Sequence, residues 1–335
     1  MPRKPLLFPR PACGRAAILR RLAAALGMGL VLAVLSLARP GPLQATPDDP
    51  AASAGQIAEN DLPQGAREKA ARHRKAAEAG NAEAQYKMGM AYNLHDKAQA
   101  VEWFRKAAEQ GHAEAQFELA LDYDADGGVP QDKAQAAKWY RMAAEQDDAM
   151  AQLALSLLYE SGDGLPQDRE KALEWLRKAA ENGSESAMLA LSRKYAAGDG
   201  LPQDSQEALK WLSGAAAYGQ LEAQYEMGLR YSRGDGVEQD QKRAIHWLEG
   251  AARRGHAGAA LLMAERHANG DGVPRDDVQA YVFLRLHMAL ADDTALPADA
   301  AALKATLEQR LTPEQQAEAR QQADALKEKA QPAAN

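Results

Sequence analysis

The segment from Asp122 to Gly127 comes closest, in residue types and spacing, to a metal-binding motif. It reads Asp-Tyr-Asp-Ala-Asp-Gly, and acidic residues at alternate positions followed by glycine begin a calcium-binding loop. The twelfth position of such a loop supplies a bidentate carboxylate, but here that position is Lys133. We therefore expect a solvated acidic turn and no metal site, and Asp122, Asp124 and Asp126 are the calcium candidate that we retain.

The other chemically reactive residues form no catalytic constellation. The seven histidines include no His-x-x-x-His pair of the kind that holds zinc on a helix. No nucleophile is placed with a base, and no glycine-rich phosphate cradle follows a strand. The single cysteine is Cys13, near the N-terminus, so the rest of the chain has no thiol catalysis, disulfide or cysteine-based zinc site. We predict a protein that is not an enzyme and that binds no cofactor.

A Gly-Asp-Gly motif recurs four times, beginning at Gly162, Gly198, Gly234 and Gly270. One active site needs one constellation, so a motif repeated this often indicates architecture. The five tryptophans have the same period, because each lies 36 residues from the next, and Phe283 continues the series. The structural repeat positions are Trp103, Trp139, Trp175, Trp211, Trp247, Tyr123, Tyr159, Tyr195 and Tyr231.

Apolar residues recur with helical spacing between these loops, as in Leu155 and Tyr159. Each unit is therefore expected to be helix A, a glycine-rich loop, helix B and a tight turn. We predict six such A/B units between about residues 82 and 292, a leading helix before them and two capping helices after them. The predicted fold class is all-α, an αα superhelical solenoid.

We interpret the tryptophans that recur every 36 residues, here called the tryptophan column, as side chains that pack between repeats. Ala172 and Ala179 lie three and four residues from Trp175, as expected of a helix face buried against a neighbour. A ladder of rings that stacks on a ligand is the alternative. In the packing interpretation, truncating one tryptophan to alanine costs roughly 3 to 5 kcal/mol.

The N-terminus has the three-part layout of an export signal. Residues 1–45 contain seven basic side chains and no acidic one, and they include an apolar run from Leu22 to Leu37. Cleavage after Ala45 is the first choice and cleavage at Ser36-Leu37-Ala38 the second. An uncleaved anchor is the alternative, although 16 residues fall short of the roughly 20 that span a bilayer. The Arg20-Arg21 pair fits a twin-arginine signal poorly.

These boundaries divide the chain into four parts. We predict a signal peptide at 1–45, a flexible linker at 46–64, the repeat solenoid at 65–292 and capping helices at 293–330. The whole chain has a formal net charge of −7, and after residue 45 it carries 33 basic and 47 acidic side chains, a net charge of −14. Because nucleic-acid binding needs a positive surface, we exclude nucleic acid as a partner.

The repeat pattern resembles the Sel1-like repeat family, relatives of the tetratricopeptide repeats. The resemblance covers nearly all of residues 65–330 and reads Ala-x-x-x-Leu-Gly-x-x-Tyr-x-x-Gly-x-Gly-Val/Leu-Pro-x-Asp-x-x-x-Ala-x-x-Trp-x-x-x-Ala-Ala-x-x-Gly. It implies a right-handed αα superhelix in an exported bacterial adaptor. A cysteine-rich branch of the family is linked to β-lactam binding or hydrolysis, but its paired cysteines are missing here, so that link does not carry over.

One strip of helix A, through positions 83, 87 and 91 and their equivalents in later repeats, is expected to be free. Its character changes along the chain from acidic to apolar to partly basic. We predict that it lines a concave surface and binds an extended or helical segment of a partner; the alternative is that its apolar residues meet a neighbouring loop. The predicted partner-binding residues are Met150, Ala154, Leu158, Ala190, Lys194, Arg230 and Arg266.

The leading functional prediction is therefore a non-enzymatic adaptor or regulator that binds a protein partner. The export signal places it in the periplasm or outside the cell, with no membrane insertion after cleavage. A structural factor that binds an envelope glycan or exopolysaccharide is the second reading, and an enzyme that acts on cell-wall or β-lactam substrates is the third. The sequence identifies no particular partner.

Overall fold

The computed structural model describes residues 62–125, 127–291 and 296–330. These residues form fifteen α-helices and no strand, so the all-α prediction is confirmed. The predicted signal peptide and most of the predicted linker lie outside the described residues, and the four-part division of the chain stays a prediction. The helices are α2 (Gln64–Glu78), α3 (Ala82–Tyr92), α4 (Lys97–Glu109), α5 (Ala113–Asp124), α6 (Lys133–Ala144), α7 (Ala149–Ser161), α8 (Arg169–Glu181), α9 (Glu185–Ala197), α10 (Ser205–Ala217), α11 (Leu221–Arg233), α12 (Gln241–Arg253), α13 (Ala257–Asn269), α14 (Asp277–Leu290), α15 (Ala298–Arg310) and α16 (Pro313–Ala330).

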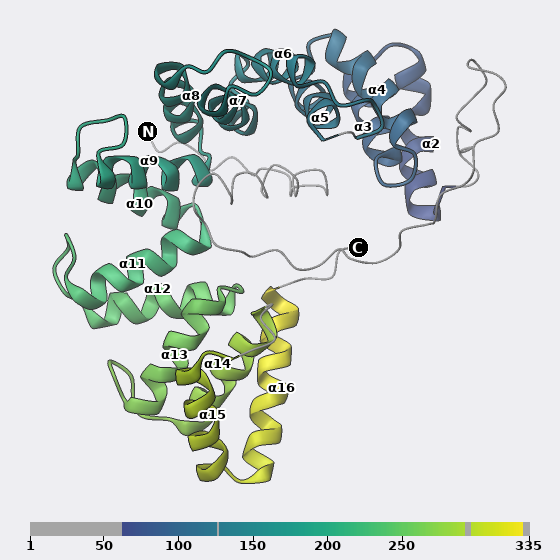
Figure 1. The fold of residues 1–335 in the computed structure, drawn as a ribbon. Coiled ribbons are helices and arrows are strands. Elements are labelled where there is room, and N and C mark those ends of the chain that lie inside the picture. Colours follow the sequence, from purple (N-terminus) through teal and green to yellow (C-terminus); the bar gives the residue numbers. More distant parts are fainter. Residues whose placement is uncertain (1–61, 126, 292–295, 331–335) are drawn as a thin grey trace, which may run out of the picture. The chain divides into compact units, whose positions relative to one another are not determined.

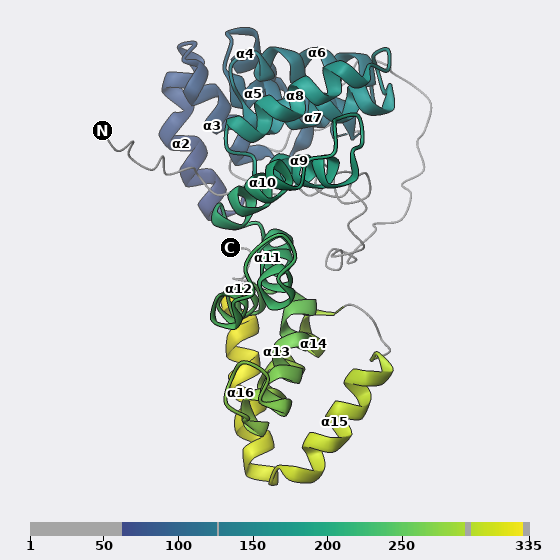
Figure 2. The same cartoon turned by 90° about the vertical axis from the view of Figure 1, so that its left-hand side faces the viewer.

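The described helices belong to two compact units, α2–α8 up to residue 182 and α9–α16 from residue 183. Within each unit, every A helix packs against its own B helix, and each B helix packs against the A helix that follows it in the same unit, as in α3 with α4 and α4 with α5 (Figure 1). In the second unit α16 lies along α14, and α15 leads into it (Figure 2). Each helix pair therefore buries its apolar face against its neighbours, which is how a repeat array is stabilised.

Aspartate begins every B helix of the six repeats. The side chain at this N-cap accepts a hydrogen bond from a backbone N–H two or three residues later, for example from Gln99 to Asp96 at 3.0 Å. Such a cap contributes about 1 kcal/mol, because it pairs an N–H that the helix leaves open. The recurring aspartates are therefore explained by helix capping. They are Asp96, Asp132, Asp168, Asp204, Asp240 and Asp276.

The residue that directly follows each tryptophan in the sequence is buried in the core, and these residues form the column next to the tryptophans. Phe104, Leu176 and Leu212 are exposed by 3 % or less. The tryptophans themselves are only partly buried, and the Lys178 ammonium lies 4.2 Å from the ring centroid of Trp175. The predicted cost of roughly 3 to 5 kcal/mol for truncating a tryptophan stays a prediction. Because the tryptophan rings are only partly buried, we expect the larger loss of stability on truncation in the neighbouring column.

Candidate interaction surfaces

Glutamine side chains join successive repeats inside each unit. Gln116 of α5 is buried, and its Nε2 donates to the carbonyl of Ala108 at the end of α4, at 3.1 Å. Its Oε1 accepts a hydrogen bond from Gln146, at 2.8 Å. The same arrangement recurs around Gln85, Gln152 and Gln224. Both ends of the buried amide are satisfied, so these residues serve the architecture.

Tyrosine and arginine form a second link between repeats in the first unit. The Arg141 guanidinium of α6 donates to the hydroxyl of Tyr159 at 2.9 Å, and Arg105 donates to Tyr123 in the same way. The tyrosine column was predicted as structural from its period alone. The structure gives it a partner 18 residues earlier in the chain, which sequence reasoning missed.

The apolar part of the predicted strip lies on α7 and is mostly covered. Met150, in the first turn of the helix, is partly exposed, but Ala154 and Leu158 are only 5 % and 6 % exposed. The prediction that this strip is free is wrong for the last two residues. Leu158 is equivalent to Asp122, whose carboxylate meets Lys97 of the preceding B helix, so this end of helix A is covered by its neighbour.

The basic part of the strip, in the second unit, holds loops. Lys194 donates to the carboxylate of Asp199 at 3.0 Å, and Arg230 donates to the carbonyl of Asp235 at 3.3 Å. Each partner lies five residues later, in the Gly-Asp-Gly loop that folds back over the end of helix A.

Arg266 donates to the carbonyl of Asp271 in the same manner. It also donates to Gln241 at 3.0 Å and to Ser232, both in the preceding repeat. Arg266 and Ala190 are 5 % and 1 % exposed, so for these residues too the predicted free surface is wrong. Their assignment to partner binding stays a prediction, and the contacts give the basic side chains an architectural role.

The first position of the strip, in the N-terminal turn of helix A, is at least partly exposed in every repeat. In the first unit this row contains Glu83, Glu114 and Met150. The Lys87 ammonium lies 2.8 Å from Glu83, and the His112 ring lies 2.8 Å from the same carboxylate. Hydrogen bonds from these two side chains lower the pKa of Glu83. The row therefore presents two carboxylates beside an apolar side chain.

The expectation of a solvated acidic turn is wrong, because Asp122 and Asp124 of the calcium candidate are only 3 % and 6 % exposed and both contact lysines. Lys97 donates to Asp122 at 2.7 Å, and Lys133 donates to the carboxylate of Asp124. Burial raises the pKa of Asp122 to about 6, although Lys97 lowers it. Asp126 lies outside the described residues. Lys133 stands where a calcium loop needs a bidentate carboxylate, and it forms an ion pair with Asp124, one of the candidate calcium ligands.

The histidines of the A-helix starts act as caps. His112 and His256 accept hydrogen bonds at Nδ1 from the N–H groups of Ala115 and Ala259. In the second unit, Nε2 of His256 lies 3.1 Å from Glu222, and this contact lowers the pKa of Glu222. Among the residues that the structure describes, no three histidines, cysteines or acids are placed to hold a metal ion.

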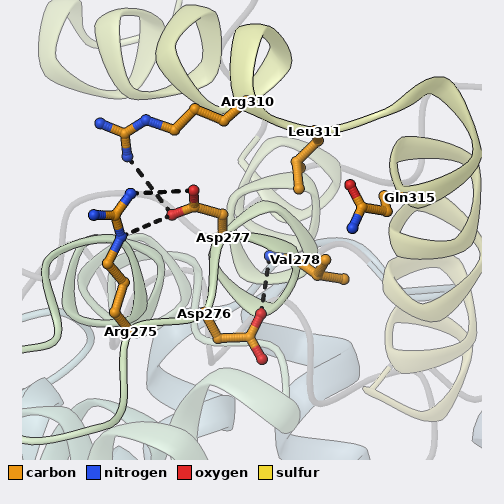
Figure 3. Close-up of a pocket in the computed structure, with 7 residues that line it drawn as sticks. All are labelled: Arg275, Asp276, Asp277, Val278, Arg310, Leu311 and Gln315. Atoms are coloured by element: carbon orange, nitrogen blue, oxygen red, sulfur yellow. Dashed lines mark hydrogen bonds and ion pairs between the residues drawn. The ribbon is translucent and has the colours of Figure 1, made fainter.

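One pocket, of about 330 Å³, lies at the start of α14 in the second unit. The Arg275 guanidinium donates from Nε and Nη2 to the carboxylate of Asp277, both at 3.3 Å. Arg310, the last residue of α15, brings Nη1 to 3.6 Å from the same carboxylate (Figure 3). The remaining lining residues are Asp276, Val278, Leu311 and Gln315.

The sequence analysis did not predict this pocket, although Arg275 departs from the repeat pattern and could have indicated it. Four earlier repeats have glutamine where the last repeat has Arg275. Each glutamine donates to a backbone carbonyl seven residues earlier and thereby closes the loop onto helix A, at 2.6 to 2.9 Å. The four glutamines are Gln131, Gln167, Gln203 and Gln239.

The family is identified by its repeats. The Sel1 repeat family model matches residues 82–112, 113–148, 147–184, 185–217, 221–256 and 257–286. This chain therefore belongs to the Sel1 repeat family, as the sequence pattern predicted. Sel1 repeat proteins are typically scaffolds for protein interactions and are generally non-enzymatic.

Two solved structures support the same fold. One is a protective antigen present in uropathogenic Escherichia coli strains, described as displaying an SLR fold, with 33 % sequence identity and a TM-score of 0.63 over 76 % of this chain. The present chain spans only 56 % of that antigen's length. The other is a Sel1 repeat protein from Oxalobacter formigenes, with 27 % identity and a TM-score of 0.60; the match covers 67 % of this chain and 99 % of that protein.

No curated protein matches this chain. Among the helices in the described part of the chain, none has the length and apolar character needed to cross a membrane.

Proposed function

We propose that this protein is a non-enzymatic adaptor that binds a protein segment across the first turns of its A helices, in the bacterial periplasm. The observation that carries the proposal is a contrast between two kinds of polar residue. Those that recur in every repeat cap helices, close loops or join neighbouring repeats. Those in the first turns of the A helices differ from repeat to repeat, as expected of a surface that reads a partner.

The first unit indicates the chemistry of the partner segment. The carboxylates of Glu83 and Glu114 are more than half exposed, and Met150 follows them in the next repeat along the array. Carboxylates select basic groups and direct their approach, while a flexible methionine adapts to an apolar side chain. A segment with one or two basic residues followed by an apolar residue therefore complements this row.

The periplasmic location rests on the N-terminal sequence. Its basic start and its apolar run of 16 residues are the layout of an export signal.

The proposal is tested by photocrosslinking in the native envelope. A photoreactive residue is placed at position 150 in one variant and at position 145 in the control, where Glu145 is exposed at the end of α6. We expect a discrete protein adduct from position 150 and none from position 145. Glycan adducts, or no adduct at either position, would contradict the protein-adaptor proposal.

Charge reversal separates specific binding from mere exposure. Glu83→Lys with Glu114→Lys is expected to abolish the adduct from position 150. The matched control is Glu102→Lys with Glu109→Lys, which reverses two exposed glutamates on helix B of the first repeat. If both pairs reduce crosslinking equally, the A-helix row has no particular role.

A further inference from the structure

The pocket at the start of α14 is built where the last repeat departs from the pattern of the others. At the position of Arg275, four earlier repeats use glutamine to close the loop, as Gln239 does by donating to the carbonyl of Ser232 at 2.8 Å. Arg275 donates to Asp277 instead. Asp277 also stands where the first two repeats have Lys97 and Lys133. These changes are not explained by the repeat architecture.

A second arginine reaches the same place from a different helix. Arg310 ends α15, and its guanidinium and that of Arg275 both reach the Asp277 carboxylate (Figure 3). Asp277 therefore holds both guanidinium groups in position. Each group carries five N–H donors in a planar fork, and the side chains of Arg275 and Arg310 are 56 % and 44 % exposed. Donors thus remain on both arginines for a bound group.

The charges around the pocket favour a ligand with one negative charge. The Asp276 carboxylate is bonded to the backbone N–H groups of Val278 and Gln279 at the start of α14, both at 2.9 Å. Among the described residues, Asp277 alone pairs with the two guanidinium groups, so one positive charge is left over. A dianionic phosphate would have no second counter-charge here. A carboxylate matches the planar guanidinium fork with a single charge, and two parallel N–H···O bonds would hold it.

The remaining lining residues suit a short peptide. Val278 and Leu311 are apolar, and the amide of Gln315 has both a donor and an acceptor for a peptide group. The volume of about 330 Å³ lies near the lower end of the range for small-ligand sites. It admits the last one or two residues of a chain.

We propose that this pocket binds the free C-terminal carboxylate of a peptide that ends in an apolar residue. Arg275 and Arg310 bind the carboxylate, Val278 and Leu311 contact the last side chain, and Gln315 pairs with the peptide backbone. Asp277 is a positioning residue that holds the two arginines. The site is separate from the first turns of the A helices, so it goes beyond the proposed function.

The proposal is tested by titrating the protein with an N-acetylated tripeptide ending in Ala-Leu and with the same tripeptide as its C-terminal amide. Binding is followed by the NMR signals of the Val278 and Gln315 amides. We expect the free acid to bind saturably and the amide to bind at least about tenfold more weakly, since one charge-assisted hydrogen bond contributes that much. Equal binding of acid and amide, or no saturable binding up to about 5 mM, overturns the proposal.

Two further ligands distinguish the source of the negative charge. Acetate supplies a carboxylate without a peptide, and inorganic phosphate supplies a dianion. Both are expected to bind more weakly than the tripeptide acid. Acetate binding as tightly as the tripeptide would overturn recognition of a peptide end, and tighter binding of phosphate would overturn the choice of a monoanion.

Variants at the two arginines test the assignment of the residues. Arg275→Gln introduces the residue of four other repeats, so the fold is expected to tolerate it, and Arg310→Gln removes the second guanidinium. Each is expected to weaken binding of the tripeptide acid about tenfold, again the effect of one charge-assisted bond. Arg233→Gln, at an exposed arginine of α11, is the control and is expected to leave binding unchanged. Unchanged binding in Arg275→Gln would refute the assignment.

Discussion

Asp122 is a buried carboxylate that is expected to destabilise the folded protein at neutral pH. It lies in the last turn of α5 with 3 % of its surface exposed. One oxygen accepts a hydrogen bond from Lys97 at 2.7 Å. The other, Oδ2, has no hydrogen-bond partner among the described residues. Burial is the dominant effect, and it raises the pKa of Asp122 from 3.8 to about 6.

The direction of the pH effect follows from this shift. Between pH 3.8 and about 6, the folded protein binds a proton at Asp122 that the unfolded chain does not bind. The free energy of unfolding therefore falls as the pH rises through this window. A difference of about two pKa units corresponds to roughly 3 kcal/mol at neutral pH, at about 1.4 kcal/mol per unit.

The test is Asp122→Asn, which removes the charge and keeps the size of the side chain. At pH 7.5 the variant is expected to be about 3 kcal/mol more stable than the parent protein, because the pKa of about 6 already includes the contact with Lys97. At pH 4 the two proteins should differ little. Native-state hydrogen exchange of the α5 amides measures the local free energy, and ¹³C NMR of the Asp122 carboxyl carbon measures its pKa.

Asp163→Asn is the control, because Asp163 is exposed in a loop. It should leave the pH dependence of unfolding unchanged. A carboxyl signal of Asp122 that titrates below pH 4 would refute the reasoning, and so would an Asp122→Asn variant that is destabilised equally at both pH values.

Three further predictions concern packing, loop closure and pH. Leu176→Ala should cost about 3 kcal/mol in urea unfolding, more than Trp175→Ala, because Leu176 is fully buried and the tryptophan is not; a larger loss in Trp175→Ala would show that the tryptophans carry the core. Gly164→Ala should lower the melting temperature more than Gly111→Ala. Both glycines have a positive φ, but only a Cβ at position 164 would clash with the backbone of Lys133. An equal fall in melting temperature in the two variants would rule out that close approach. The pKa of Glu222 is lowered by His256. The stability that this contact contributes is therefore present above the pKa of Glu222 in the unfolded chain and is lost as the pH falls through its pKa in the folded protein. Glu222→Gln should reduce the loss of unfolding free energy at acid pH, measured by chemical unfolding, and an unchanged dependence of the unfolding free energy on pH would contradict the prediction.

The period of the sequence predicted much of the fold because each repeat is a local unit. Trp175 and Tyr159 belong to columns that recur every 36 residues, and helical spacing around them predicted the alternation of A and B helices that the structure shows. Asp168 stands directly before a helix in the sequence, and the structure shows its side chain capping that helix. Capping and helical periodicity depend on neighbours in the chain, so a single sequence contains the information for them.

The candidate binding surface was predicted less well, because exposure depends on how loops and neighbouring repeats pack. Helical periodicity shows which residues share a face, but not what covers that face. The Gly-Asp-Gly loop folds back over the end of helix A, and Arg230 and Arg266 donate to its carbonyls. The basic residues of the predicted strip therefore hold loops, while Met150, in the first turn of its helix, remains partly exposed.

The family and the arrangement of six helix pairs could be predicted from the sequence alone, since the repeat pattern is set within a few residues of the chain and by its regular period. The tertiary structure decided which column forms the core, which charges are paired and where a pocket lies. Phe104, Asp122 and Arg310 each acquire their role from contacts with another helix. Such contacts join residues that are distant in sequence, so their burial and charge are fixed only when the helices pack.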